Sequence, residues 1–527
     1  MNRGKWARGF VALATVVAWL GVARPVAAQF LAPALDHPGF DRRLSQPSLR
    51  LSMLGGVSLL FDDENNELNL WDFGGSSLGM LSDRDSSSFD FFLSTASSAT
   101  KHTVGTVDRE IQRASGLNTG LQAIGRSPGT FALGVDAGYL VGETGIPAQD
   151  GIYQSRSSNT PVAIPVLNGT AFGGKWGYGI RFAFTNSSIN NDLKTETEKD
   201  GEVLLEDGDV VGSPPFDISE GKVHATGLGL GIGYTPSKNL NIALNFDALN
   251  NKLHGSNNNA RRVYELDEPQ NSAEWSLTAI ARPSWVVVGA QVGRRSFDSS
   301  QEYRFSQSGG LNGPPLVSRG DRLLRDYRQD WLRSRLMLAP PSLPKLQVAG
   351  DLNVRYDRDQ VDPATTPGNY NEFLVDLSID TLQLAPAVTS TLDELRHWNA
   401  GLGASYRLTP RLQFGAEGHR YNTALDGPAV HSRQKLTDLK AGAEYVVSST
   451  WTGRAGYSHR SADDDVYTAN NETMTNLATF GAGYARPGSK YSLDAGFEIG
   501  KRDTNYPDPT KTTGSLFRFM FYNRWAL

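Results

Sequence analysis

The last fourteen residues, GSLFRFMFYNRWAL (514–527), alternate between two kinds of side chain. Every second residue from Phe517 to Leu527 is large and apolar except Asn523, whereas the interleaved positions include Arg518 and Arg524. Successive side chains of a β-strand point to opposite faces, so the segment is predicted to be a strand with one apolar face. Such a strand suits a transmembrane barrel, whose outer face meets lipid and whose inner face meets water.

The N-terminus predicts export. Basic residues precede an apolar run over 10–22, and the small residues of 26–28 predict a signal peptide that is cleaved after Ala28. The apolar run has about 13 residues, fewer than the ~20 that a membrane helix needs. Open strand edges are not satisfied in lipid, so a membrane form of the mature chain must be a closed barrel. The absence of cysteine excludes disulfides, thiol catalysis and lipoprotein anchoring.

The same alternation recurs along the chain and predicts strands over 130–143, 158–167, 174–187, 222–235, 238–250, 270–282, 284–297, 326–338, 343–357, 398–408, 410–421, 433–447, 450–460, 473–486, 489–502 and 514–527. Segment 158–167 fits least well, because its prolines cannot donate to a ladder. A β-propeller would need a repeated blade motif, which the sequence lacks. The predicted fold class is therefore all-β, a transmembrane antiparallel β-barrel of about sixteen strands, with 14–18 tolerated.

The connections between these strands are of two lengths. Segments such as 282–284, 409–411 and 448–450 are tight and rich in Pro, Ser and Thr, whereas 188–220 and 358–390 are long and polar. Short turns at one end and long loops at the other are typical of outer-membrane barrels, with the loops outside the cell. Aromatic residues near strand ends predict an interfacial girdle formed by Trp176, Trp275, Trp285, Trp398, Trp451 and Trp525.

The segment before the barrel, 29–129, is rich in glycine and aspartate with short apolar patches. It contains Gly55-Gly56, then Asp62-Asp63, then NLWDFGGSSLGML at 69–81. This order of features resembles the start of the FadL-type outer-membrane transporter superfamily, where small residues, an acidic pair and an NPAGL-like motif lead into the barrel. Here Asp72 and the three residues that follow it replace the Asn-Pro-Ala core of that motif.

The resemblance implies that the N-terminal segment is a plug inside the lumen, with Asp62, Asp63 and Asp72 as plug residues. It also implies a hydrophobic ligand that leaves sideways through the barrel wall. We therefore expect a signal peptide over 1–28, a plug or periplasmic segment over 29–129, and the barrel over 130–527. Residues 86–129 are interpreted as plug, with two further strands as the alternative.

Motifs for catalysis or metal binding are absent from the sequence. None of the eight histidines has the spacing of metal ligands, and neither Gly-x-Ser-x-Gly nor His-Glu-x-x-His occurs. His419 beside Glu417 is interpreted as a rim histidine in a polar network. The acidic segment 188–220 lacks the spacing of a Ca²⁺ loop and is interpreted as a solvated surface loop. We expect no enzymatic activity, no cofactor and no bound metal.

The predicted inner face combines charges of both signs. It can line a water-filled pore with a transverse field, or form a salt-bridged interior around a plug, and the pattern does not decide between them. The residues predicted to line the lumen are Arg181, Asp247, Asp351, Arg355, Arg407, Glu417, Glu444, Arg454, Asp494, Glu498 and Arg518.

The predicted function is passage of small molecules across the bacterial outer membrane, with a hydrophobic solute implied by the resemblance. A general porin is one alternative, and a barrel that anchors or exports surface polymer or protein is another. The expected partners are outer-membrane lipid, the solute, and the barrel-assembly machinery, which would engage the C-terminal strand. With a net charge of −5, the chain lacks the excess of positive charge that is typical of nucleic-acid-binding proteins, so nucleic acid is not an expected partner.

Overall fold

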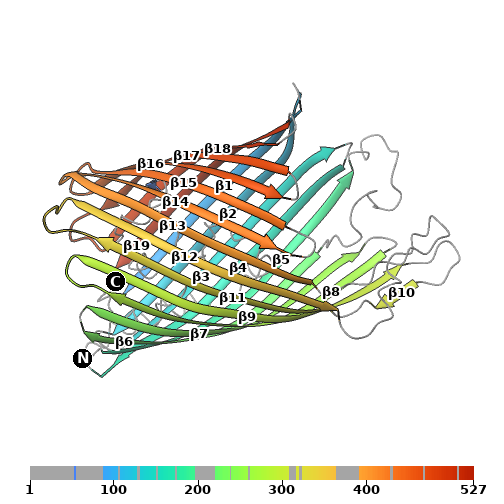
Figure 1. Ribbon diagram of the computed structural model, residues 1–527, viewed down its shortest axis with the longest axis horizontal. Helices are drawn as coiled ribbons and strands as arrows, with labels where there is room; N and C mark the ends of the chain where they lie inside the picture. Colours follow the sequence, from blue (N-terminus) through green and yellow to red (C-terminus); the bar gives the residue numbers. More distant parts are fainter. Residues whose placement is uncertain are drawn as a thin grey trace.

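The computed structural model describes residues 53–54, 87–104, 107–127, 131–149, 152–172, 175–195, 220–237, 239–258, 262–307, 316–319, 323–363, 391–427, 431–466, 469–506 and 510–526. Its strands form one antiparallel sheet that curves into a barrel (Figure 1). They are β1 (Ser88–Val104), β2 (Val107–Ser127), β3 (Phe131–Gln149), β4 (Ile152–Ala171), β5 (Trp176–Thr195), β6 (Glu220–Ser237), β7 (Leu240–Asn258), β8 (Arg262–Ala281), β9 (Val286–Gln307), β10 (Leu316–Arg319), β11 (Leu323–Leu338), β12 (Leu346–Pro363), β13 (Thr391–Thr409), β14 (Leu412–Asp426), β15 (His431–Val446), β16 (Trp451–Val466), β17 (Ala469–Ala485), β18 (Tyr491–Asn505) and β19 (Thr510–Ala526).

The sheet closes on itself where the first strand meets the last. β1 pairs with β19 over its whole length, from Ser88 opposite Ala526 to Val104 opposite Thr510. Of the nineteen described strands, only the short β10 lies outside the ring, because β9 pairs with β11 as well as with β10. The wall therefore has eighteen strands, an even number, as single-chain outer-membrane barrels have. Closure leaves no unpaired edge, which lipid would not tolerate.

Large apolar side chains cover the outer face of β5 to β9 and of β11 to β19 in one continuous zone, which we call the belt. Phe497 and Phe519 lie directly opposite each other and are 41% and 36% exposed, so they face outward rather than into a core. Each of these strands contributes a stretch of five to eleven residues to the belt, compared with the ~9–11 residues that a tilted strand needs to cross a bilayer. The outward positions of the belt lie within 176–184, 228–234, 240–248, 273–281, 286–292, 332–338, 346–354, 398–408, 414–418, 439–445, 451–457, 478–484, 491–499 and 517–525.

No helix in the described part of the chain is long and apolar enough to cross a membrane.

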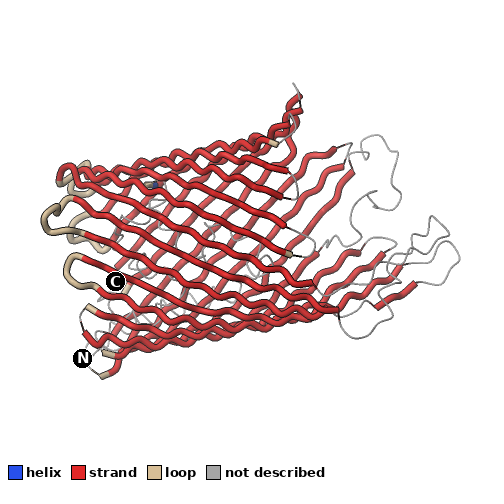
Figure 2. The backbone as a smooth tube through the Cα atoms, viewed as in Figure 1, coloured by secondary structure: helices blue, strands red, loops and turns tan. Residues whose placement is uncertain are grey.

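The predicted short turns are confirmed, and the six tryptophans predicted to form the girdle all lie on the outer face. The short connections at 282–285, 339–345, 410–411 and 447–450 lie together at one end of the barrel (Figure 2). All six predicted girdle tryptophans are between 38% and 47% exposed on the outer face. Trp176, Trp285, Trp451 and Trp525 lie at the short-turn edge of the belt, and Trp275 and Trp398 lie toward the other edge.

The wall begins earlier than expected, and this difference corrects the strand number. β1 and β2 belong to the ring, so the barrel starts at Ser88 rather than at residue 130, and 88–127 is wall rather than plug. The count is eighteen instead of the expected sixteen, at the limit of the tolerated range. The alternation in β1 is obscured because Phe92 faces inward and is 4% exposed, buried with Met53.

The strands also extend far beyond the belt on the side away from the short turns. β7 continues to Asn258 and β8 begins at Arg262, so most of the predicted loop 251–269 is strand. The same holds for 461–472, where β16 ends at Val466 and β17 begins at Ala469. Outside the bilayer both faces meet water, so the ladder of hydrogen bonds continues while the alternation of side chains disappears.

Candidate functional site: the inner wall of the barrel

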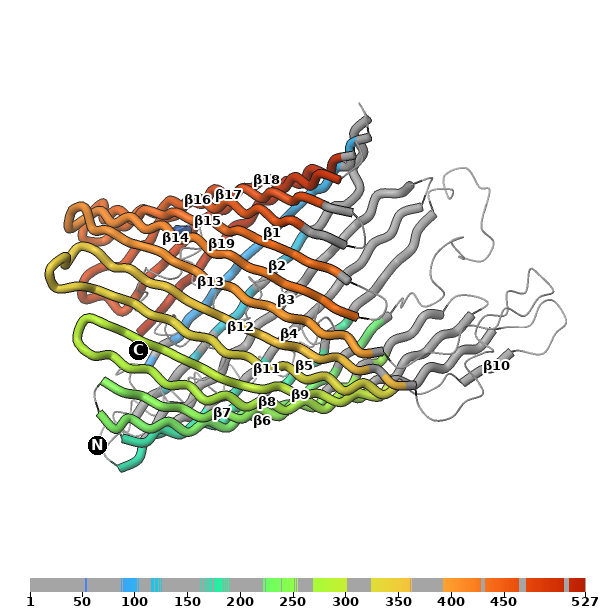
Figure 3. Tube along the Cα trace, in the orientation of Figure 1, coloured from blue at the N-terminus to red at the C-terminus, as the bar shows by residue number. Residues whose placement is uncertain are grey.

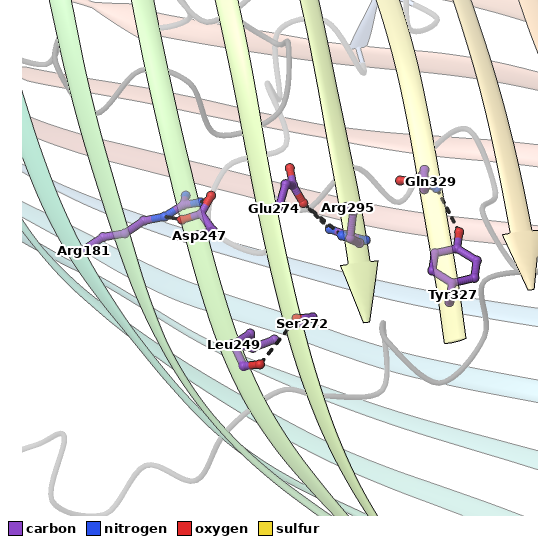
Figure 4. Close-up of polar contacts among 8 residues, drawn as sticks. All are labelled: Arg181, Asp247, Leu249, Ser272, Glu274, Arg295, Tyr327 and Gln329. Carbon is purple, nitrogen blue, oxygen red and sulfur yellow. Dashed lines mark hydrogen bonds and ion pairs between the residues drawn. The ribbon is translucent and has the colours of Figure 1, made fainter. Parts of the chain in front are cut away.

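Charged side chains on the inner wall join neighbouring strands in pairs. Arg181 of β5 reaches over β6 to Asp247 of β7, with Arg181 Nε 2.9 Å from Asp247 Oδ1 and Nη2 2.5 Å from Oδ2 (Figure 4). Arg295 of β9 donates to Glu274 Oε2 of β8 from Nε at 2.9 Å and from Nη2 at 2.7 Å. These charge-assisted, two-point contacts fix both partners against the wall rather than leaving them free in the lumen.

A second set of pairs lies across β15 to β19. Arg454 of β16 donates from Nε to Glu444 Oε2 at 2.8 Å, and its Nη1 bonds Asp494. Arg454 is therefore shared by acids on both sides, and its side chain is only 10% exposed. Farther from the short turns, Arg518 Nη2 lies 3.2 Å from Glu498 Oε2. In this sector too, each buried charge has an opposite charge within reach.

A larger charged group, which we call the central cluster, spans β11 to β16. Lys440 Nζ lies 3.3 Å from Glu417 Oε1 and 3.6 Å from Asp438 Oδ2. His419 Nε2 lies 3.2 Å from the same Glu417 oxygen, and its Nδ1 lies 3.6 Å from Asp351 Oδ1. Glu417 has no exposed side-chain surface and His419 has only 6%. His419 is thus buried in the wall at the edge of the belt, and β14 continues to Asp426 beyond it, so the predicted position at the rim is wrong.

The central cluster also includes the charges that balance its acids. Arg460 Nη2 of β16 lies 3.0 Å from Asp438 Oδ2. Arg335 of β11 lies directly opposite Asp351 in the register of β11 and β12. Three acids, Asp351, Glu417 and Asp438, therefore meet three bases, Arg335, Lys440 and Arg460, in addition to His419. The cluster has little net charge with which to select an ion.

Aromatic side chains interrupt the polar inner wall just beyond the belt. The rings of Phe297 and Tyr327 stack with centroids 4.7 Å apart, and Arg325 Cζ lies 5.3 Å from the Phe297 centroid. Gln329 Nε2 donates to the Tyr327 hydroxyl at 3.0 Å (Figure 4). Burial, and next the charge of Asp357, raise the pKa of Tyr327, so its hydroxyl stays neutral.

Trp331 extends this aromatic group toward the belt. It is 8% exposed and packs over Gly293, where a Cβ would collide with its ring. Sequence reasoning missed Phe297, Tyr327 and Trp331 as inward-facing residues. The alternation of inward and outward positions along a strand could have identified them. For example, Leu332 and Leu336 face outward from β11, so Trp331 must face inward.

Of the residues before Ser87, only Met53 and Leu54 are described, and both lie against the inner wall. Thr479 Oγ1 donates to the Met53 carbonyl oxygen at 2.9 Å, and neither Met53 nor Leu54 is exposed. At Gly496 a Cβ would come within 2.6 Å of Met53 Cγ, so the close approach requires a residue without a side chain. Met53 is buried together with Phe92, Met520 and Tyr522, which belong to the first and last strands.

All eleven residues predicted to line the lumen lie on inward positions of their strands, and ten have a partner of opposite charge or a histidine. Arg355 pairs with Asp357 on its own strand, with Nε 2.8 Å from Oδ1. Arg407 is exposed near the short turns and forms no ion pair with a described residue. The predicted plug residues Asp62, Asp63 and Asp72, and the signal peptide, lie outside the described residues.

A search of the described residues finds no group of three histidine or acidic side chains that could hold a metal ion. The pairs of the inner wall hold strands together, and they favour the interpretation of a salt-bridged interior over that of opposed free charges.

Comparison with known proteins gives likeness of overall shape only. No family model matches the sequence, and no curated protein matches it. Among solved structures, the toluene transporter TodX of Pseudomonas putida is 12% identical with a TM-score of 0.35, covering 91% of this chain and 98% of its own. A FadL homologue of Pseudomonas aeruginosa is 12% identical with a TM-score of 0.34, covering 91% and 99%. The ferric-catecholate import receptor Fiu of E. coli K12 is 10% identical with a TM-score of 0.42, covering 84% and 82%.

Proposed function

We propose that this barrel transports small apolar molecules across the bacterial outer membrane and releases them through a seam in its wall. The observation that carries the proposal is an interruption between β4 and β5 at the height of the belt. In their register, Asn159 is opposite Ser188 and Val162 is opposite Thr185, while residues 160, 161, 164 and 165 of β4 have no partner in β5. The other neighbour, β3, pairs with β4 through the same residues, including Pro161 and Pro165.

The seam has a simple chemical cause. Proline has no backbone N–H, so Pro161 and Pro165 cannot donate to β5. Val166 pairs with Arg181, and Ala163 pairs with Phe184, which places the interruption beside the outward phenylalanines of β5. The register of β4 and β5 continues unbroken through the missing pairs, so the seam is a weakly bonded stretch of the wall, and a local separation of the two strands there would open into lipid rather than into water. An apolar molecule could leave there, whereas a polar solute would lose its hydration.

The inner wall is consistent with an uncharged cargo. Its charges are neutralised locally in pairs, so the lumen has no strong field of one sign to concentrate ions. The aromatic group of Phe297, Tyr327 and Trp331 is at most 8% exposed, so it packs within the wall and offers little surface to a solute. The apolar part of the proposed route is therefore the seam.

We further propose that the N-terminal segment fills part of the lumen as a plug. Met53 and Leu54 support this, because both are completely buried against the inner faces of β15, β17 and β18. An eighteen-stranded barrel is wide enough for an aqueous channel unless chain fills it. A plug would suppress the leak of polar solutes while leaving the lateral route available.

Reconstituted vesicles test the function. The wild type should take up an apolar fluorescent probe faster than empty vesicles do, with little swelling in sucrose. The double substitution Pro161→Val/Pro165→Val restores two donors, and it should remove probe uptake while leaving conductance unchanged. Pro340→Val, in a short turn, serves as the matched control and should leave both unchanged.

The alternatives give different results in the same assay. A general porin would swell in sucrose and ignore the proline substitutions. An anchor or exporter would give neither uptake nor conductance. Either outcome would refute apolar transport through the seam.

A further inference from the structure

The outer wall has a basic band immediately beyond the belt, on the side away from the short turns. On each strand we consider the first two outward positions past the belt. Six neighbouring strands, which lie side by side in Figure 3, each contribute one cation there. These residues, which we call the basic band, are Arg294 of β9, Arg328 of β11, Arg358 of β12, Arg396 of β13, Arg420 of β14 and Lys435 of β15.

The band is confined to this sector of the wall. Its twelve positions include only two acids, Asp330 and Glu394, and all six cations are exposed. The equivalent positions of β5 to β8 hold a single lysine, Lys252, and no acid. Those of β16 to β19 hold Lys501, whose Nζ lies 3.0 Å from Asp503 Oδ2. From β5 to β19, the excess of positive charge is thus confined to β9 to β15.

Two arginines of the band are placed where they repel each other. Arg328 and Arg358 lie directly opposite in the register of β11 and β12, and both are exposed on the outer face. Like charges in such a pair destabilise a sheet. Neither forms an ion pair within the described part of the chain; Arg358 Nη2 makes only a 3.4 Å contact with Gln360 Oε1. On its other side Arg358 lies opposite Glu394, whereas Arg328 lies opposite Ser296, so an external anion beside Arg328 would offset the charge that remains.

Other cations of the band are partly engaged. Arg294 pairs with Asp330 at 2.6 Å, and Arg396 pairs with Glu394 at 3.1 Å. Arg420 bonds the Thr437 hydroxyl, and Lys435 forms no ion pair with a described residue. Arg358 lies opposite Glu394 and Lys435 lies opposite Asp463 in the register, without an ion pair. Arg328 and Arg420 have neither an ion pair nor an acid directly opposite among the described residues.

The position of the band identifies the kind of anion. It begins where the apolar outer face ends, for example at Arg294 after Val292 and at Arg396 before Trp398, so it lies at the height of lipid headgroups. Arginine forks match phosphate oxygens in two-point geometry. Six adjacent strands span roughly 24 Å, enough to contact more than one phosphate.

We infer that the basic band binds the phosphate groups of an anionic glycolipid in the outer leaflet, with its acyl chains lying on the belt below. The Arg328–Arg358 pair holds one phosphate, and Arg420 and Lys435 extend the contact. This inference concerns the outer wall and is independent of the solute route through the lumen.

A binding experiment on the purified full-length barrel in non-ionic detergent tests the inference. The probes are a bis-phosphorylated lipid A glycolipid and its dephosphorylated form, titrated by native mass spectrometry. The double substitution Arg328→Gln/Arg358→Gln should weaken binding of the phosphorylated lipid about 30-fold, since each cation near a charged membrane surface contributes about 1 kcal/mol. The control Lys252→Gln/Lys501→Gln removes the same charge from other sectors and should change binding less than about twofold.

Other outcomes overturn the inference. Equal binding of both lipids by the wild type, or equal weakening by the two double variants, would show that the band does not recognise phosphate. Displacement of the lipid by inorganic phosphate would show a simple anion site without a membrane partner. A salt titration of the wild type keeps the test independent of variant folding, because binding should weaken as ionic strength rises. Probe uptake should be unchanged in Arg328→Gln/Arg358→Gln, which separates this inference from the proposed transport.

Discussion

A depth series on the final strand tests whether the belt is where the chain meets lipid. The outward positions of β19 within the belt run from Phe517 to Trp525, and their centre is Phe521, which lies opposite Leu93 and Ala495. An arginine on the lipid face costs about 2–4 kcal/mol at the bilayer midplane and about 0–1 kcal/mol near its edges. The cost should therefore fall stepwise as the substitution moves from Phe521 toward Ser515.

The geometry of the strand sets the size of each step. Neighbouring outward positions are two residues apart, which is about 6.7 Å along the strand and about 5 Å in depth at a tilt of ~40°. Relative to alanine at the same position, arginine should cost about 3 kcal/mol at Phe521, about 2 at Phe519, about 1 at Phe517 and about 0 at Ser515. Comparison with alanine removes the contribution of the lost phenylalanine packing.

Equilibrium unfolding in urea with lipid vesicles, followed by tryptophan fluorescence, measures these differences. A flat profile, or a cost at Ser515 equal to that at Phe521, would show that this face does not contact lipid. A maximum at Phe517 would move the bilayer away from the short turns and would contradict the placement of the basic band at its edge.

Three further predictions follow from the inner wall and the turns. Arg454→Gln should destabilise the barrel by about 3–5 kcal/mol, because it leaves Glu444 and Asp494 in the wall without their partner. Adding Glu444→Gln/Asp494→Asn to this variant should recover most of the lost stability, as measured by unfolding in urea. The valine side chain in Gly481→Val would collide with Met53. If residues 53–54 anchor a plug, this variant and a deletion of residues 30–85 should both show raised, ohmic conductance in planar bilayers. A cysteine at Pro410 should resist an impermeant maleimide on whole cells while one at Asp209 reacts; the reverse pattern would invert the topology.

The sequence was most informative where the chain meets lipid. In 398–408 and 489–502 the outward residues are apolar and the inward ones polar, because lipid and water impose opposite requirements on the two faces. Beyond the belt this difference ends, and the strands through 251–269 and 461–472 could not be recognised from alternation. The alternation of faces along each strand still predicted the inward position of all eleven lumen residues, since a strand has only two faces.

The partners of those residues depended on the register, which alternation does not define. Arg181 bonds Asp247 across an intervening strand, and Arg454 bridges acids that are ten and forty residues away in the chain. Similarly, the apolar inward residues Phe92 and Met520 contradict the simple pattern because they face other parts of the chain instead of water. These exceptions mark the places where the inner wall contacts something other than solvent.

The Met53 site illustrates how closure and the N-terminal segment depend on each other. Phe92 lies opposite Tyr522, and Ser94 lies opposite Met520, only because β1 pairs with β19. The apolar surface that buries Met53 is therefore complete only in the closed barrel. Burial of a methionine side chain is worth about 1.5–3 kcal/mol, and this energy is available only when the first and last strands are joined. Docking of residues 53–54 thus stabilises the closed ring, and closure in turn creates the surface on which those residues dock.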